Sequence, residues 1–102
     1  MRMDRIGPVD AGTLLLRALR ASAAAAGCTV AIESLAARPW SSATFTGTRH
    51  RVVLALEADA AAWLDALPKA EFALRGHLVA DLAVVARGDG RAMIDVLTLV
   101  EG

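Results

Sequence analysis

The chain has 102 residues, a length that suits one domain with a single core, and its 11 basic and 11 acidic residues give a formal net charge of zero. Zero net charge and the scarcity of aromatic residues argue against nucleic acid and against an anionic membrane as partners. The single cysteine, Cys28, excludes an internal disulfide and favours a reducing compartment. No stretch reaches the roughly 18 apolar residues of a membrane span. We therefore expect a cytoplasmic, single-domain protein over residues 1–102, with residues 1–9 as a flexible N-terminal segment.

The charges are unevenly distributed along the chain. Residues 1–52 hold seven Arg against three acids, and residues 53–102 hold four basic residues against eight acids, so the halves carry +4 and −4. Packing of the two halves against each other would neutralise both. A basic face that meets an anionic partner fits the same distribution.

The first predicted helix covers residues 11–26. Asp10 stands at the N-cap position, and Gly27 is the expected terminator. Leu15 and Leu19 share one stripe of this helix and should face the core. We interpret Cys28, which follows at the entrance to a strand, as a small buried apolar residue and not as a nucleophile.

Two extended segments follow this helix, residues 29–37 and 44–57. Pairing Ile32 with Val52 aligns the apolar faces of the two strands. The same register sets Glu33 beside Arg51, a favourable pair of opposite charges. It leaves residues 38–43 as a long connection.

A short second helix is predicted over residues 60–67, capped by Asp59 and ended by Pro68. Its packing residues recur at helical spacing and are Trp63, Leu64 and Leu67.

The last hairpin is marked by strict alternation around a Gly88-Asp89-Gly90 turn. Pairing Arg87 with Arg91 across the turn makes one face of the hairpin continuously apolar. The opposite face also carries apolar residues, namely Val79, Val85, Met93, Leu97 and Leu99. A sheet face in water should alternate more cleanly, so we expect a second copy of the chain to cover these residues as a dimer interface.

The element order is α-β-β-α-β-β, which predicts an α+β fold with a four-stranded, antiparallel-rich sheet and two helices on one face. The order is a circular permutation of a ferredoxin-like sandwich, for which the sheet order is 3-4-2-1. In that arrangement we expect the second and fourth strands to be central and parallel. A simple meander, 1-2-3-4, is the alternative.

The stretch from residue 38 to residue 51 is rich in Arg and hydroxyl residues and contains no acid. Such a composition could hold an anion, because guanidinium groups donate paired hydrogen bonds to oxyanions. The candidate ligand-binding residues are Arg38, Trp40, Arg49, His50 and Arg51. Alternatively, Trp40 and Phe45 close the end of the core. We expect His50 itself to be a core-edge histidine bonded to a neighbour, with no catalytic partner placed by the sequence.

No phosphate loop, zinc spacing or calcium loop is present, so we predict no metal and no cofactor. The main hypothesis is a small homodimeric binding or interaction module without evident catalysis. The alternative is an anion-binding domain or small enzyme whose site lies in the Arg38–Arg51 stretch. The expected partners are a second copy and either a protein or a small anionic ligand.

Overall fold

The computed structural model describes residues 10–57 and 60–101 and shows an α+β fold with two α-helices and one four-stranded antiparallel sheet. The elements in chain order are α1 (Ala11–Ala25), β1 (Val30–Ser41), β2 (Thr46–Leu56), α2 (Ala61–Ala66), a 3-10 turn (Leu67–Lys69), β3 (His77–Gly88) and β4 (Arg91–Val100). The predicted flexible segment 1–9 and the predicted cap Asp59 lie outside the described residues.

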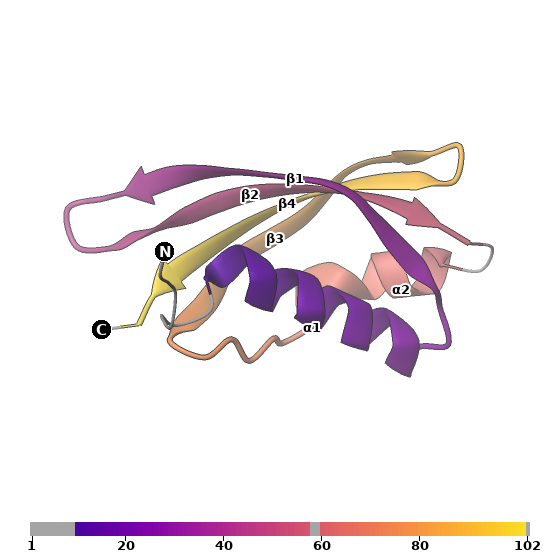
Figure 1. Ribbon diagram of the computed structural model, residues 1–102, viewed down its shortest axis with the longest axis horizontal. Coiled ribbons are helices and arrows are strands. Elements are labelled where there is room, and N and C mark those ends of the chain that lie inside the picture. Colours follow the sequence, from indigo (N-terminus) through magenta and orange to yellow (C-terminus); the bar gives the residue numbers. More distant parts are fainter. Residues whose placement is uncertain (1–9, 58–59, 102) are drawn as a thin grey trace, which may run out of the picture.

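The sheet has the strand order β1-β2-β4-β3, which is the predicted order counted from the other edge, and it is not a meander. The prediction that β2 and β4 run parallel is wrong, because all three neighbouring pairs are antiparallel. The reason lies in the connection through α2, which returns the chain to the end of the sheet where β2 began (Figure 1). Strand β3 therefore runs in the direction of β2, and the tight turn after it makes β4 antiparallel to both. The relation to a permuted ferredoxin-like sandwich stays a prediction.

Both helices lie on one face of the sheet, as predicted, and we call this the inner face (Figure 1). Helix α1 begins at its predicted cap, where the backbone N–H of Thr13 donates to Asp10 Oδ1 at 2.9 Å. Its stripe of Leu15 and Leu19 is fully buried against the sheet. Cys28 is half-buried and packs against the core.

Helix α2 is short, and contacts of its side chains with the rest of the chain stabilise it. Trp63, Leu64 and Leu67 are buried, as their spacing predicted. The indole N–H of Trp63 donates to Ser22 Oγ of α1 at 2.9 Å, so the polar atom of this large side chain is satisfied and the two helices are tied together. Pro68 lies in the 3-10 turn that follows α2.

A β-bulge at Glu33 in β1 changes the register of the first hairpin. Ile32 pairs with Leu54 and not with Val52, so the predicted register is wrong by two residues, and Glu33 does not lie beside Arg51. The extra residue at the bulge lets Leu35, which pairs with Val52, share the inner face with Ile32.

The second hairpin has its predicted pairs in the middle and differs at both ends. Leu82 pairs with Val96, as predicted, but a second bulge at Ala80 moves Val79 to the inner face, where it packs against the core. Leu78 is moved to the opposite face by the same bulge. A third bulge lies at Val85.

The turn of this hairpin is tighter than predicted. Gly88 pairs with Arg91, so the predicted pairing of Arg87 with Arg91 is wrong. The two central residues, Asp89 and Gly90, have φ angles of 55° and 74°. A two-residue turn that follows the twist of the strands requires positive φ at both positions, which an Asp-Gly pair tolerates.

Candidate functional site

The face of the sheet turned away from the helices is covered by none of the described elements, and we call it the open face (Figure 1). The strand register arranges its side chains in five rows that cross the sheet from β1 to β3. In order from the β1–β2 turn, the rows are Trp40–Gly47–Leu99–Leu78, Arg38–Arg49–Leu97–Asp81, Ala36–Arg51–Asp95–Ala83, Ser34–Val53–Met93–Ala86 and Ala31–Ala55–Arg91–Gly88.

Apolar rows and charged rows form separate bands on the open face. The first and fourth rows carry no charge and consist mainly of apolar side chains, whereas the second and third rows hold three arginines and two aspartates. In the fifth row, Arg91 donates to Glu33 across β2 at 2.8 Å, so this charge is compensated within the chain. The open face is therefore a charged band between two apolar bands.

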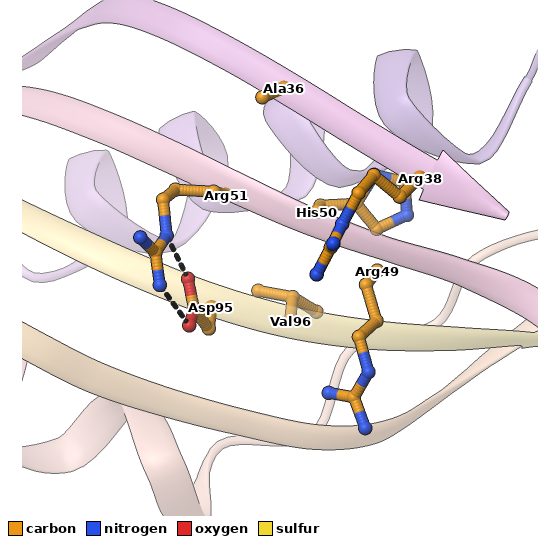
Figure 2. Close-up of a pocket in the computed structure, with 7 residues that line it drawn as sticks. All are labelled: Ala36, Arg38, Arg49, His50, Arg51, Asp95 and Val96. Carbon is orange, nitrogen blue, oxygen red and sulfur yellow. Dashed lines mark hydrogen bonds and ion pairs between the residues drawn. The ribbon is translucent and has the colours of Figure 1, made fainter. Parts of the chain in front are cut away.

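The charged band is hollowed into a pocket of about 370 Å³ (Figure 2). The residues that line it are Ala36, Arg38, Arg49, His50, Arg51, Asp95 and Val96. The small side chain of Ala36 leaves room between the longer ones, and guanidinium groups from β1 and β2 surround the space. The three arginines of the predicted anion site are thus brought together at one pocket.

Arg51 is already paired within the chain. Its Nε and Nη2 atoms donate to the two carboxylate oxygens of Asp95, both at 2.7 Å, which is the strong two-point geometry of an Arg–carboxylate pair. The hydrogen bonds from Arg51 lower the pKa of Asp95, and the charges of Arg51, Arg49 and Arg38 lower it further. Asp95 therefore stays ionised, and it is the one carboxylate among the described residues that line the pocket.

Arg38 and Arg49 are directly opposite each other on β1 and β2. Like charges in such a position are destabilising. Neither of them forms an ion pair with any described residue. Arg49 lies over the ring of Trp40, 6.0 Å from its centroid, a contact that orients the guanidinium without neutralising it. The pair therefore places two positive charges at the pocket, and neither of them forms an ion pair with a described residue.

Strand β1 continues to Ser41, so the prediction of a long connection over residues 38–43 is wrong. Because Arg38 and Trp40 are two residues apart on one strand, they point to the same face, which is how both reach the open face. Trp40 and Phe45 do not close the core: Trp40 lies in the first row of the open face, and Phe45 is 53 % exposed near the turn. The turn is held by Ser42 Oγ, which accepts from the N–H of Phe45 at 3.2 Å.

His50 belongs to the inner face, on the other side of the sheet from the three guanidinium groups. Its side chain is 3 % exposed, and its Nε2 lies 2.9 Å from Thr98 Oγ1, which confirms the prediction of a core-edge histidine bonded to a neighbour. Its Nδ1 has no hydrogen-bond partner among the described residues. Burial lowers the pKa of His50, and the nearby Asp10 opposes this effect. The neutral imidazole is therefore favoured.

The predicted dimer-interface residues divide between several positions. Met93, Leu97 and Leu99 lie on the open face, Val79 lies on the inner face, and Val85 lies at a bulge. The sequence prediction missed Leu78 and Val53, which the register places in the first and fourth rows of the open face. It also missed Asp95 as the partner of Arg51. The signal for Asp95 was weak, since only the β2–β4 register brings these residues together.

The described residues were also compared with the patterns of metal sites and membrane-spanning helices. No cluster of three or more His, Cys, Asp or Glu residues there could hold a metal ion. Neither of the described helices has the length and apolar character needed to cross a membrane. Comparison of the chain with family models, curated proteins and solved structures gives no match.

Proposed function

We propose that the chain is a homodimeric binding module whose two copies pack open face against open face. The observation that carries the proposal is the banded open face, in which apolar rows flank a charged band and no described helix covers them. Leu99 is already buried on the single chain, but Leu78 beside it is 39 % exposed. Exposed apolar positions on an antiparallel sheet are typical of a face that is buried in the assembled protein. The single cysteine favours a reducing compartment, and we place the dimer in the cytoplasm.

The size of the open face suits a dimer. Four strands at their usual spacing and about ten residues along each strand give a face about 19 Å wide and about 33 Å long. Two such faces in contact bury about 1,200 Å² if they are treated as flat, and protruding side chains add to this area. The value lies at the lower end of the range for specific, stable interfaces.

The pattern of rows selects one arrangement of the two copies. A two-fold axis parallel to the strands keeps each row opposite the same row of the partner and lays β1 over the partner's β3. Apolar rows then meet apolar rows: Trp40 faces the partner's Leu78, and Val53 faces the partner's Met93. In the charged band, Arg38 faces the partner's Asp81. The arrangement is therefore complementary in polarity and, at Arg38, in charge, whereas Arg49 faces the partner's Leu97.

The other simple arrangement has its axis perpendicular to the strands and lays the second row over the fourth. Arg38 and Arg49 would then be buried against the partner's Ser34 and the partner's Val53, which offer no carboxylate. Removing unpaired charges from water in this way is strongly unfavourable. The perpendicular axis leaves both arginines without a carboxylate, whereas the parallel axis leaves only Arg49 without one among the described residues, so we infer the axis parallel to the strands.

Sedimentation velocity at micromolar concentration tests the proposal. The wild-type chain should be dimeric, and Leu78→Glu should weaken the dimer by about 30-fold or more, since a charge replaces an apolar contact in both halves of the interface. Leu78 is 39 % exposed, so the change should leave the fold of one copy intact. The matched control is Val100→Glu, at a residue 51 % exposed and outside the open face. A wild-type monomer, or equal effects of the two variants, would refute the interface.

A further inference from the structure

The charges of the open face do not balance, even in the dimer. Each face carries Arg38, Arg49 and Arg51 against Asp81 and Asp95, whereas Arg91 is compensated by Glu33 outside this band. Asp95 is occupied by Arg51 at 2.7 Å. In the proposed dimer the partner's Asp81 meets Arg38. Among the residues that the structure describes, no carboxylate then remains for the guanidinium of Arg49 in either copy.

This surplus charge becomes costly only when the two faces meet. On a single chain, Arg49 is exposed to water and lies over Trp40. Face-to-face packing removes much of this water, and an uncompensated charge at a closed interface opposes association. The symmetry of the dimer doubles the effect, because both copies bring the same surplus. A bound anion in each copy would remove the obstacle.

The pocket has the chemistry to hold such an anion. Arg38 and Arg49 stand on neighbouring strands at directly opposite positions. In Figure 2 the Arg38 guanidinium lies over the pocket and that of Arg49 extends toward β3, and rotation of the long Arg49 side chain can bring both groups to one guest. Each guanidinium has five N–H donors, so Arg38 can contact both an anion and a carboxylate of the partner. Planar or tetrahedral oxyanions accept the parallel N–H pairs that guanidinium groups offer. At about 370 Å³ the pocket also has space for more than a single small ion.

We propose that the pocket between Arg38 and Arg49 binds one oxyanion, a phosphate or carboxylate group, in each copy and that this anion strengthens the dimer. The inference rests on the proposed face-to-face association and adds its regulation by a ligand. Because the anion binds the dimer more tightly than the separated chains, its concentration controls the dimer dissociation constant. At a phosphate concentration about twice that for half-saturation, each of two sites contributes a factor of about three, so the dimer should be about tenfold tighter.

The test measures the dimer dissociation constant by sedimentation equilibrium in sodium chloride, sodium phosphate and sodium acetate at equal ionic strength. The wild-type chain should form a tighter dimer in phosphate, in acetate or in both than in chloride. A response to phosphate alone assigns the phosphate class, and a response to acetate assigns carboxylates. Arg49→Gln should dimerise in chloride at least as well as the wild type, because the surplus charge is gone, and should respond to neither anion.

The control variant is Arg17→Gln, which removes the same charge from an exposed position on α1, away from the open face. It should behave as the wild type does. A dimer that is indifferent to phosphate and acetate overturns the anion site and leaves the dimer standing. An equal response in Arg49→Gln and in the wild type also overturns the site. A chain that stays monomeric in every buffer overturns both proposals.

Discussion

Reversing the charge of Arg38 tests the arrangement of the two copies most directly. In the proposed dimer Arg38 faces the partner's Asp81, and symmetry produces this contact twice. Exposed pairs of opposite charge contribute about 0.2–1 kcal/mol each, and like charges cost a similar amount. Arg38→Asp turns two attractions into two repulsions, so the dimer should lose about 1–4 kcal/mol, a weakening between about 5-fold and about 1,000-fold.

The same substitution should not harm the single chain. Arg38 is directly opposite Arg49 on β2, so an aspartate there replaces a like-charge pair with an opposite-charge pair. We expect the free energy of unfolding in urea to stay the same or to rise by about 1 kcal/mol. A weaker dimer made of equally stable chains cannot be explained by unfolding.

The assay is sedimentation equilibrium over a range of chain concentrations in low-salt chloride buffer, where charge contacts are least screened. Asp81→Arg alone should weaken the dimer as Arg38→Asp does, and the double variant should restore it to within about threefold, since each new contact is again of opposite sign. Two single variants that leave the dimer unchanged, or a double variant that adds the two losses, would show that these residues do not meet.

Three further predictions concern the single chain and are read from urea unfolding. Because burial lowers the pKa of His50 below its ordinary 6.5, the unfolded chain takes up a proton first, so stability should fall from pH 7 to pH 5 by at most about 1.4 kcal/mol per pH unit. His50→Gln should remove this slope, and an identical slope in the variant would contradict the assignment. Gly47→Ala should cost about 1–3 kcal/mol, because the added carbon overlaps the carbonyl oxygen of Thr98, whereas an unchanged stability would mean that β2 and β4 shift apart freely. Ser22→Ala should cost about 1–3 kcal/mol by leaving the Trp63 indole N–H without its acceptor, and Ser22→Thr, which keeps a hydroxyl, should cost less.

The helices and the second hairpin could be predicted from local sequence because their signals are local. Asp10 caps α1 through a residue three positions away, and Leu15 and Leu19 recur at helical spacing. The Gly88-Asp89-Gly90 signal correctly located the turn of the second hairpin, although the turn has two central residues and not the predicted three. Each of these features depends on residues only a few positions apart in the sequence.

The bulges could not be predicted, and they account for the errors in register of the second hairpin, whereas the error in the first hairpin comes from the tight turn after Ser41. A bulge inserts one residue and exchanges the faces of everything on one side of it. Ala80, at the bulge in β3, is a small residue that gives no sign of its role, yet Leu78 and Val79 exchange faces because of it. The predicted interface therefore included Val79 and omitted Leu78.

The candidate site was predicted in part. Arg38, Arg49 and Arg51 lie close together in sequence, and their residue types suggested an anion site. Their convergence depends on β1 continuing to Ser41, which keeps Arg38 in register with Arg49. Asp95 lies 44 residues after Arg51, on another strand, and no local sequence pattern predicts that the two residues pair.

The bulges also disfavour assembly through the edges of the sheet. Strands β1 and β3 are the two edges of the sheet, and each is interrupted by at least one bulge, while Pro39 removes a backbone donor from β1. A neighbouring chain that added its own strand at either edge would find no long regular ladder to continue. Growth into open-ended filaments by edge pairing is thus disfavoured at both sides of the sheet, which leaves the open face for the proposed dimer, a closed assembly of two copies.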